Sequence, residues 1–193
     1  MSGTLLVTAF EPFGGERVNA SRSAVDALPE RIGAWTLIRR TLPVVFGEAA
    51  RQVIRAAEES QADAVLCIGQ AAGRSRVTPE MLGVNLRYAA IPDNAGRAPK
   101  DEPVEEGGPA AVFSTLPVRL MAQAICDAGL PGAVSLSAGA YVCNDVLYSV
   151  LRHFSGTAVC AGFVHVPALP GQNAVCLPAA DAAAALCAAI LAL

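Results

Sequence analysis

The sequence predicts an α/β fold. Apolar and β-branched runs bounded by turn residues alternate with amphipathic stretches along the chain, which is the pattern of strands alternating with helices. The length of 193 residues matches about one domain of the usual ~150 residues. The sequence contains neither an internal repeat nor a low-complexity linker, so we expect a single domain over 1–193.

Strands are predicted where short apolar runs end at turn residues. The run at 4–10 precedes an irregular Pro- and Gly-containing loop, 64–68 is wholly apolar, and 158–166 is terminated by Pro167. The segment 78–91 is ambiguous and is compatible with an extended pair of strands. The predicted strands are 4–10, 35–41, 64–68, 134–136 and 158–166.

Helices are predicted where apolar residues recur at helical spacing. In 46–60, Val53, Ile54 and Ala57 share one face, and charged residues largely occupy the other. A long loop rich in Pro, Gly, Asp and Glu covers 92–109, and loops of that length within a domain are usually functional or disordered. The predicted helices are 21–28, 46–60, 118–128, 144–154 and one from about 179 onward.

Charge and composition exclude several classes of protein. The net charge of -3 argues against a nucleic-acid or anionic-membrane partner, because either requires a concentrated positive field. Hydrophobic residues make up 53% and charged residues 16%, against roughly 25% charged in an average domain, so disorder is not expected. Only five of the 31 charged residues follow Glu106, so much of the second half must be buried in the core or at a subunit contact.

The two ends and the cysteines predict a cytoplasmic protein. The start lacks a basic segment and a cleavage site typical of signal peptides. Pro178 and Asp181 interrupt the apolar stretch 173–193, which favours a packing helix over a membrane span. The six cysteines form no C-x-x-C pair, and with only two histidines a zinc site is improbable, so we expect a reducing compartment and no metal or cofactor.

Cys143 is a candidate nucleophile. Small residues at 137–140 lead into the predicted helix, whose first turn holds Cys143 and Asn144. The positive end of the helix dipole and the free N–H groups there lower the pKa of a thiol and favour the thiolate. The alternative is that Cys143 is one of six cysteines that pack as small hydrophobic residues.

His165 and Glu80 are candidates for the base and for the acid that orients it. His165 lies at the C-terminal end of a predicted strand, where the catalytic groups of α/β sheets gather, although a core histidine is the alternative. Glu80 lies in an apolar context, where a carboxylate requires a partner. The three would form a Cys–His–acid constellation, but sequence spacing does not show that they meet.

The chain resembles the pyroglutamyl peptidase I family, whose members are cysteine peptidases that remove an N-terminal pyroglutamate from peptides. The resemblance runs nearly from end to end in six ordered blocks. These blocks are VTAFEPFGG at 7–15 with Asn19, GQAAGR at 69–74, TPE at 78–80, IPDN at 91–94, SAGAYVCN at 137–144 and HVP at 165–167.

The resemblance implies a three-layer α/β/α sandwich with a mixed, mostly parallel central sheet, a triad of Glu80, Cys143 and His165, and no cofactor. It also implies peptides with an N-terminal pyroglutamate as substrates and assembly as a homotetramer. The positions that match the family's substrate-binding residues are Phe10, Phe13, Asn19, Gln70 and Tyr141. Phe10 as a core residue and Tyr141 as a packing residue are the structural alternatives.

One departure from the family concerns the oxyanion region. The family usually has an arginine directly before Ile-Pro-Asp-Asn, whereas this chain has Ala90. Arg87 would replace that arginine only if the local backbone turned it inward. Losing one oxyanion donor can lower the rate by about 10²- to 10³-fold. Two rival functions therefore remain: a weakened member that binds pyroglutamyl peptides, and a thiol hydrolase acting on another small cyclic amide or acyl group.

Overall fold

A six-stranded sheet forms the centre of the protein. The computed structural model describes residues 2–193, so residue 1 of the expected domain lies outside the described part. Strands β3, β1, β4 and β8 are parallel, and β2 and β5 pair antiparallel at the two edges. The strands, in sheet order, are β2 (Arg31–Ile32), β3 (Trp35–Leu42), β1 (Gly3–Phe10), β4 (Ala64–Gln70), β8 (Cys160–Val166) and β5 (Thr78–Pro79).

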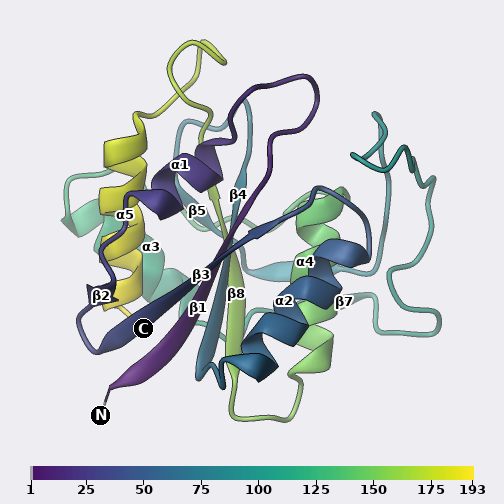
Figure 1. Cartoon of the computed structure of the whole chain (residues 1–193), viewed down its shortest axis with the longest axis horizontal. Helices are drawn as coiled ribbons and strands as arrows, with labels where there is room; N and C mark the ends of the chain where they lie inside the picture. The colour runs from purple at the N-terminus through teal and green to yellow at the C-terminus, as the bar shows by residue number, and fades with distance from the viewer. Residues whose placement is uncertain (1) are drawn as a thin grey trace.

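Helices cover both faces of this sheet (Figure 1). One face carries α1 (Ala20–Asp26), α3 (Val118–Asp127) and α5 (Ala179–Leu191), whose apolar side chains form one core with the sheet. The opposite face carries α2 (Glu48–Glu59) and α4 (Val142–His153) over a second core. The prediction of a three-layer α/β/α sandwich with a mixed, mostly parallel sheet is confirmed.

The layers explain why the inner strands are so apolar. Helices on both sides remove each central strand from water, so a run of apolar residues replaces the alternation of a half-exposed strand. Every residue of β4 from Ala64 to Gly69 is buried, as are the last six residues of β8. The parallel register of β4 and β8 places Gly69 opposite His165. These two strands therefore end side by side.

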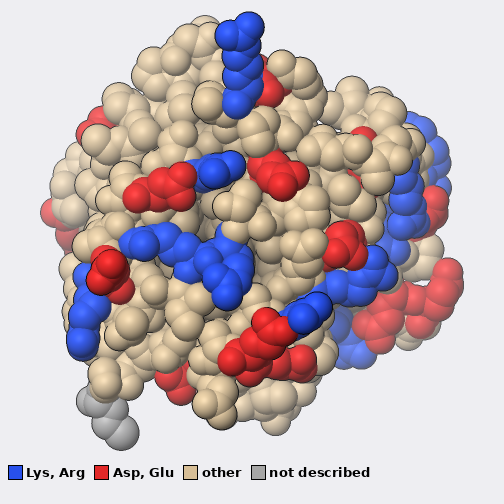
Figure 2. Space-filling view, in the orientation of Figure 1, with Lys and Arg blue, Asp and Glu red and all other residues tan. Residues whose placement is uncertain are grey.

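The C-terminal helix and the surface charges agree with the composition. Helix α5 packs against α1 and α3, as expected for a packing helix. Within the described residues, no helix combines the length and apolarity needed to cross a membrane. Figure 2 shows that acidic and basic side chains are interspersed on one face of the molecule.

Several short elements differ from the prediction. The strand expected at 134–136 is wrong: Ser135 forms only an isolated bridge with Glu80, in which the Met81 amide donates to the Ser135 carbonyl at 2.8 Å. The ambiguous segment 78–91 contributes β5 and β6 (Leu82–Val84), and β6 pairs with the unpredicted β7 (Ala111–Phe113). Strands of two or three residues are too short to produce a periodic signal.

Candidate active site

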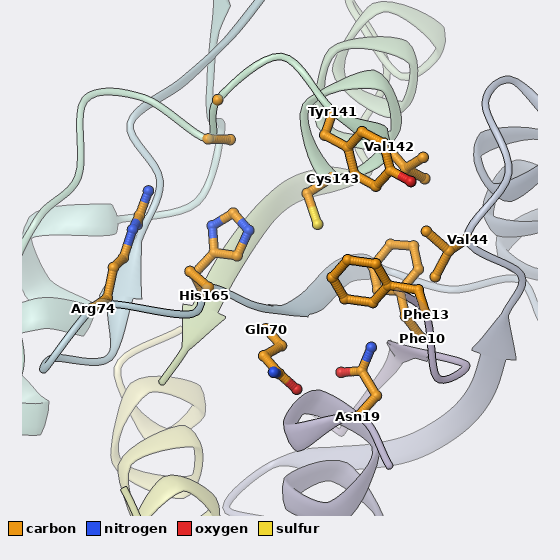
Figure 3. Close-up of a pocket in the computed structure, with 13 residues that line it drawn as sticks. Phe10, Phe13, Asn19, Val44, Gln70, Arg74, Tyr141, Val142, Cys143 and His165 are labelled. Atoms are coloured by element: carbon orange, nitrogen blue, oxygen red, sulfur yellow. The ribbon is translucent and has the colours of Figure 1, made fainter. Parts of the chain in front are cut away.

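Cys143 is the second residue of α4. Tyr141, directly before the helix, has an extended backbone, and Val142 and Cys143 begin the first turn. The helix thus starts two residues before the predicted position 144. The half-buried Cys143 side chain lines a cavity, and Figure 3 shows its sulfur facing the imidazole of His165 across that cavity. Within residues 2–193, no hydrogen bond joins this sulfur to His165.

Glu80 and His165 form a buried hydrogen-bonded pair. Strand β5 pairs antiparallel with β8, with Thr78 opposite His165, and the Glu80 amide continues the pairing by donating to the Phe163 carbonyl at 2.8 Å. The distance from His165 Nδ1 to Glu80 Oε1 is 2.7 Å. Glu80 is 0% exposed and His165 is 3% exposed. The buried carboxylate therefore has the partners that it was expected to require, His165 and Arg74, whose Nη1 donates to Oε1 at 2.6 Å.

The ionisation of this pair follows from its surroundings. Burial opposes the charge of Glu80, but the hydrogen bond from His165, the hydroxyl of Ser135 and the charge of Arg74 together outweigh it and hold the pKa of Glu80 below its usual value. Burial also lowers the pKa of His165, against the raising effect of Glu80. Because an ionised carboxylate only accepts, His165 carries its proton on Nδ1 and leaves the lone pair of Nε2 unprotonated.

The thiol of Cys143 does not behave as the helix position predicted. Burial and the charge of Glu80 raise the pKa of Cys143 to about 12, although the cation of Arg74 and the residue's own backbone N–H act in the opposite direction. The expectation of a stabilised resting thiolate is therefore wrong. Loss of water around the sulfur outweighs the favourable end of the helix dipole.

The cavity has a volume of about 220 Å³ and a mostly apolar wall. Phe10 and Phe13 approach from β1 and the loop after it, and Tyr141 packs against both Phe13 and Phe46, with ring centroids 6.1 Å and 5.2 Å apart. The structure brings together Cys143, His165 and all five residues predicted to bind substrate. The residues that line the cavity are Phe10, Phe13, Asn19, Val44, Gln70, Ala71, Arg74, Ala138, Gly139, Tyr141, Val142, Cys143 and His165.

Asn19 and Gln70 also support the start of α1. Asn19 is the N-cap, and its Oδ1 accepts from the Ser21 amide at 3.0 Å. Gln70 Oε1 accepts from the Ala20 amide at 2.6 Å. The side-chain oxygens of both residues are therefore engaged within the protein, whereas the Gln70 amide nitrogen donates to none of residues 2–193 and remains available at the cavity.

A metal site is not evident at this cavity. Across residues 2–193, no group of three or more His, Cys, Asp or Glu side chains is arranged to hold a metal ion. The polar groups at the cavity are instead a thiol, an imidazole, a guanidinium and two amides. This set fits nucleophilic chemistry on an uncharged carbonyl better than it fits metal ligation.

The family of the chain follows from comparison with known proteins. A family model described as pyroglutamyl peptidase matches residues 3–191. The chain belongs to the pyroglutamyl peptidase family. Its similarity to individual members covers nearly the whole length of both chains.

Two relatives and two structures illustrate the similarity. Pyrrolidone-carboxylate peptidase of Levilactobacillus brevis is 49% identical, covering 87% of this chain and 83% of the relative. The Escherichia fergusonii peptidase of the same name is 46% identical, covering 94% and 86%. Pyroglutamyl peptidase I of Bacillus amyloliquefaciens has a TM-score of 0.94 at 34% identity, covering 99% and 96%. A Pyrococcus furiosus pyrrolidone carboxyl peptidase mutant has a TM-score of 0.91 at 38% identity, covering 98% and 97%.

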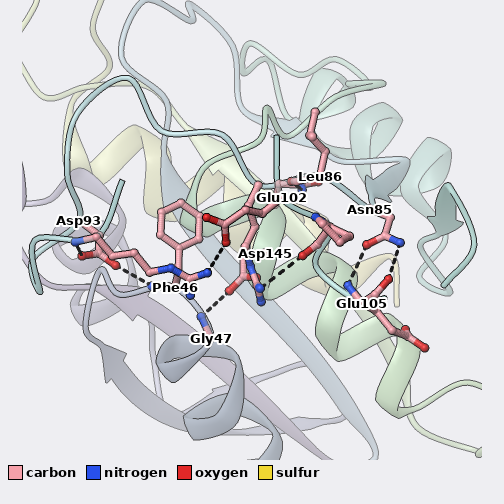
Figure 4. A network of polar contacts seen from close by, with 12 residues as sticks. Phe46, Gly47, Asn85, Leu86, Asp93, Glu102, Glu105 and Asp145 are labelled. Carbon is pink, nitrogen blue, oxygen red and sulfur yellow. Dashed lines mark hydrogen bonds and ion pairs between the residues drawn. The ribbon is translucent and has the colours of Figure 1, made fainter. Parts of the chain in front are cut away.

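Arg87 does not replace the cation that this pyroglutamyl peptidase homologue lacks at Ala90. Arg87 Nε donates to the buried Asp145 Oδ1 at 2.6 Å, and Arg87 Nη1 donates to the Pro103 carbonyl of the loop at 92–109 at 3.4 Å. Asp145 also accepts from the Gly47 amide at 2.7 Å, as Figure 4 shows. Arg87 thus anchors the loop and is absent from the cavity wall.

Ala90 itself lies on a segment that runs beside the candidate nucleophile. The Tyr88 amide donates to the Ala140 carbonyl at 2.8 Å, and the Tyr141 hydroxyl donates to the Pro92 carbonyl at 3.0 Å. Ala90 is exposed between these two contacts. A longer side chain at this position would start near the residues that precede Cys143.

Sequence reasoning gave no role to two residues at the site of this family member, Arg74 and Gly69. Arg74 lies in a matched sequence block, but the sequence does not show that its guanidinium meets Glu80. Gly69 ends the apolar part of β4 directly beneath Cys143. A Cβ at Gly69 would lie 2.8 Å from the Phe163 ring and 2.9 Å from Cys143 Sγ. A glycine inside a strand is the signal of such a close approach.

Replacing Gly69 with alanine is expected to displace the nucleophile. The added methyl group forces Cys143 or Phe163 to shift, and a displacement of about 1 Å can lower the rate by about 10²-fold. Crowding should also destabilise the fold by about 1–3 kcal/mol. Steady-state kinetics and thermal unfolding measure the two effects. The destabilisation should be smaller in the Cys143→Ala background, and an unchanged rate and stability would contradict this geometry.

Proposed function

We propose that this chain removes the N-terminal pyroglutamyl group from peptides, with Cys143 as nucleophile, His165 as acid and base, and Glu80 as the group that orients His165. Membership of the pyroglutamyl peptidase family supports the peptidase activity. The observation that carries the assignment of roles is the Glu80–His165 pair facing Cys143 at the end of an apolar cavity.

The cavity suits a small, flat and uncharged ring. Phe13 and Tyr141 offer aromatic surface to a lactam, with the buried Phe10 behind them, and the amide nitrogen of Gln70 can donate to its carbonyl. An ordinary N-terminal residue carries an ammonium group, whose transfer into this apolar space would cost free energy. The wall therefore selects for an N-terminus that is already cyclised and neutral.

Acylation starts from a neutral thiol on Cys143 and a neutral imidazole on His165. As Cys143 Sγ attacks the carbonyl between pyroglutamate and the next residue, its proton passes to His165 Nε2, and Glu80 stabilises the resulting imidazolium. The imidazolium then protonates the departing amine, and the C–N bond breaks to leave a thioester on Cys143. The Cys143 backbone N–H, free in the first turn of α4, is positioned to donate to the developing oxyanion.

Deacylation uses the same groups in the opposite sense. His165 takes a proton from water as the water oxygen attacks the thioester carbonyl. Collapse of the tetrahedral intermediate breaks the C–S bond, and the proton returns from His165 to the thiol. Pyroglutamic acid leaves, and the site regains the thiol and the neutral imidazole.

Release of a fluorophore from a pyroglutamyl amide tests this function. We expect hydrolysis that requires a reductant, because the reaction needs the free thiol of Cys143. A panel of other N-terminally blocked amides should be cleaved much more slowly. The absence of release by folded, reduced protein would overturn the assignment, and faster cleavage of another cyclic amide would identify a different substrate.

Alkylation of Cys143 should increase steeply with pH. Since burial raises the pKa of this thiol to about 12, its thiolate fraction keeps growing between pH 7 and pH 10. Iodoacetamide at neutral pH should therefore modify the exposed Cys126 and Cys160 before Cys143. Peptide mapping by mass spectrometry at a series of pH values measures the three rates. A plateau of Cys143 labelling near neutral pH would instead indicate a resting thiolate.

Ala90 favours a second candidate function, the binding of pyroglutamyl peptides with weakened catalysis. Arg87 forms an ion pair with Asp145, so it does not supply the cation that is missing at Ala90. Calorimetric titration of a pyroglutamyl peptide, beside the hydrolysis assay, distinguishes the two candidates. Tight binding without turnover favours the binder, and restoration of turnover by Ala90→Arg would locate the defect.

The remaining assignments concern the setting of the reaction. We propose that residues 1–193 act as one catalytic domain, as a homotetramer in the cytoplasm, without a cofactor. Exposed apolar side chains such as Phe113, Leu120 and Leu136 support self-association. Light scattering coupled to gel filtration measures the oligomeric state, and a monomer at micromolar concentration would contradict the tetramer.

A further inference from the structure

Arg74 connects the segments that carry the candidate acid and the candidate nucleophile. It lies in the loop between β4 and β5, and its Nη1 donates to both Thr78 Oγ1 and Glu80 Oε1 at 2.6 Å. Its Nη2 donates to the Ser137 carbonyl at 2.8 Å, on the segment that leads into α4. We propose that Arg74 is a positioning residue that holds Glu80 ionised and fixes the Cys143 segment relative to the Glu80–His165 pair. This inference rests on the proposed function.

The contacts of Glu80 show why a second donor matters. Oε1 accepts hydrogen bonds from both His165 Nδ1 and Arg74 Nη1, at 2.7 Å and 2.6 Å. Oε2 is buried and accepts from none of residues 2–193. The hydroxyl of Ser135 is directed to the Ser137 carbonyl at 3.2 Å. Without Arg74, the fully buried carboxylate would keep only neutral partners, the imidazole of His165 and the nearby hydroxyl of Ser135, and would rotate or gain a proton more easily.

The guanidinium suits this task for geometric reasons. It is planar and always charged, and its nitrogens have fixed relative directions, so one group can bind a carboxylate on one side and a carbonyl on the other. Ser137 is four residues before Tyr141, with which the turn into α4 begins. The contact with the Ser137 carbonyl therefore ties the approach to Cys143 directly to the acid.

The charge of Arg74 also sets the protonation of the pair. A nearby cation disfavours protonation of both Glu80 and His165, and the reaction requires the carboxylate and the neutral imidazole together. Only 28% of the Arg74 side chain is exposed, so its charge is weakly screened by water toward Glu80. Removal of the cation should make the pair bind protons more readily, and the acidic limb of the pH–rate profile should move to higher pH.

Three variants separate the charge of Arg74 from its geometry. Arg74→Met removes both, Arg74→Lys keeps a charge that cannot bridge Glu80 and Ser137 together, and Arg76→Met removes an exposed arginine of the same loop. We expect Arg74→Met to lower kcat by about 10²-fold with KM changed less than about threefold, because a displacement of about 1 Å has an effect of this size. Its acidic limb should move to higher pH.

Arg74→Lys should keep the acidic limb close to that of the wild type and regain only part of kcat. Arg76→Met should match the wild type in both respects. A loss confined to KM would make Arg74 a substrate contact and overturn the proposal, as would an unchanged acidic limb in Arg74→Met. Thermal unfolding establishes that each variant is folded, and the lysine variant carries the test if the methionine variant does not fold.

Titration of His165 by NMR tests the proposal without turnover. The chain has two histidines, His153 and His165, so His153→Gln assigns the imidazole signals. The apparent pKa of the His165–Glu80 pair should rise in Arg74→Met and stay unchanged in Arg76→Met. An unchanged titration in Arg74→Met would overturn the role of Arg74, whereas an inactive wild type with the expected titration would overturn only the proposed function.

Discussion

Replacing Cys143 with alanine is expected to lower hydrolysis of a pyroglutamyl amide by about 10⁴- to 10⁶-fold, the effect of deleting a catalytic nucleophile. The substitution removes the atom that we propose attacks the carbonyl and accepts the acyl group. It leaves Glu80, His165 and the aromatic wall in place, so binding of the pyroglutamyl peptide should persist. Fluorogenic kinetics, calorimetric binding and thermal unfolding measure the three properties.

Cys126→Ala is the matched control for this experiment. Cys126 is exposed on α3 and does not line the cavity, so its removal should leave the rate unchanged. A folded Cys143→Ala protein that retained full activity would show that another group performs the reaction. Equal losses in both variants would indicate a general effect of cysteine removal on the fold.

Replacing Glu80 with glutamine is expected to lower kcat by about 10³- to 10⁴-fold. Glutamine preserves the shape, but it is neutral and cannot stabilise the imidazolium or fix the proton on His165 Nδ1, and the loss of the carboxylate in such a triad costs about 10⁴-fold. It also leaves the Arg74 cation without its buried partner. The pH–rate profile and the free energy of unfolding measure these effects.

A second Glu–His pair supplies the control. Glu58 Oε1 and His153 Nε2 are 2.9 Å apart in an exposed pair on the outer surface of α2 and α4. Exposed pairs contribute about 0–1 kcal/mol, so Glu58→Gln should change neither rate nor stability appreciably. If Glu80→Gln retained more than about a tenth of wild-type activity, Glu80 would not be the group that orients the base.

The long elements were predictable because their signals are local. The strands at 4–10 and 158–166 are continuous apolar runs, and 46–60 has a clear helical period, so each was found within two residues of its observed ends. Strand β2 is only two residues long, and β7 and the loop at 134–136 depend on contacts with segments distant along the chain. A two-residue strand exists because its partner is present, and this information is absent from a short window.

In the site, too, the residues with a local sequence signal were predictable and the properties that depend on three-dimensional contacts were not. The residues of the proposed triad and of the cavity were identifiable from their sequence blocks, and the structure places Cys143 and His165 at one cavity with Glu80 behind the histidine. The pKa of Cys143 was not predictable, because desolvation depends on how tightly the neighbours close around the sulfur. The roles of Arg74 and Gly69 were not predicted for a similar reason. Arg74 matters through its 2.6 Å contact with Glu80, and Gly69 matters because a Cβ there would lie 2.9 Å from Cys143 Sγ; neither contact is visible in the sequence.

The most direct test of the central claim is detection of the thioester on Cys143. Incubation with a pyroglutamyl nitrophenyl ester makes acylation fast, so the acyl group should accumulate before water removes it. Acid quenching followed by intact mass measurement and peptide mapping should find one pyroglutamyl group per chain on Cys143, and none in Cys143→Ala. Turnover without any adduct, or an adduct on a different residue, would contradict the account.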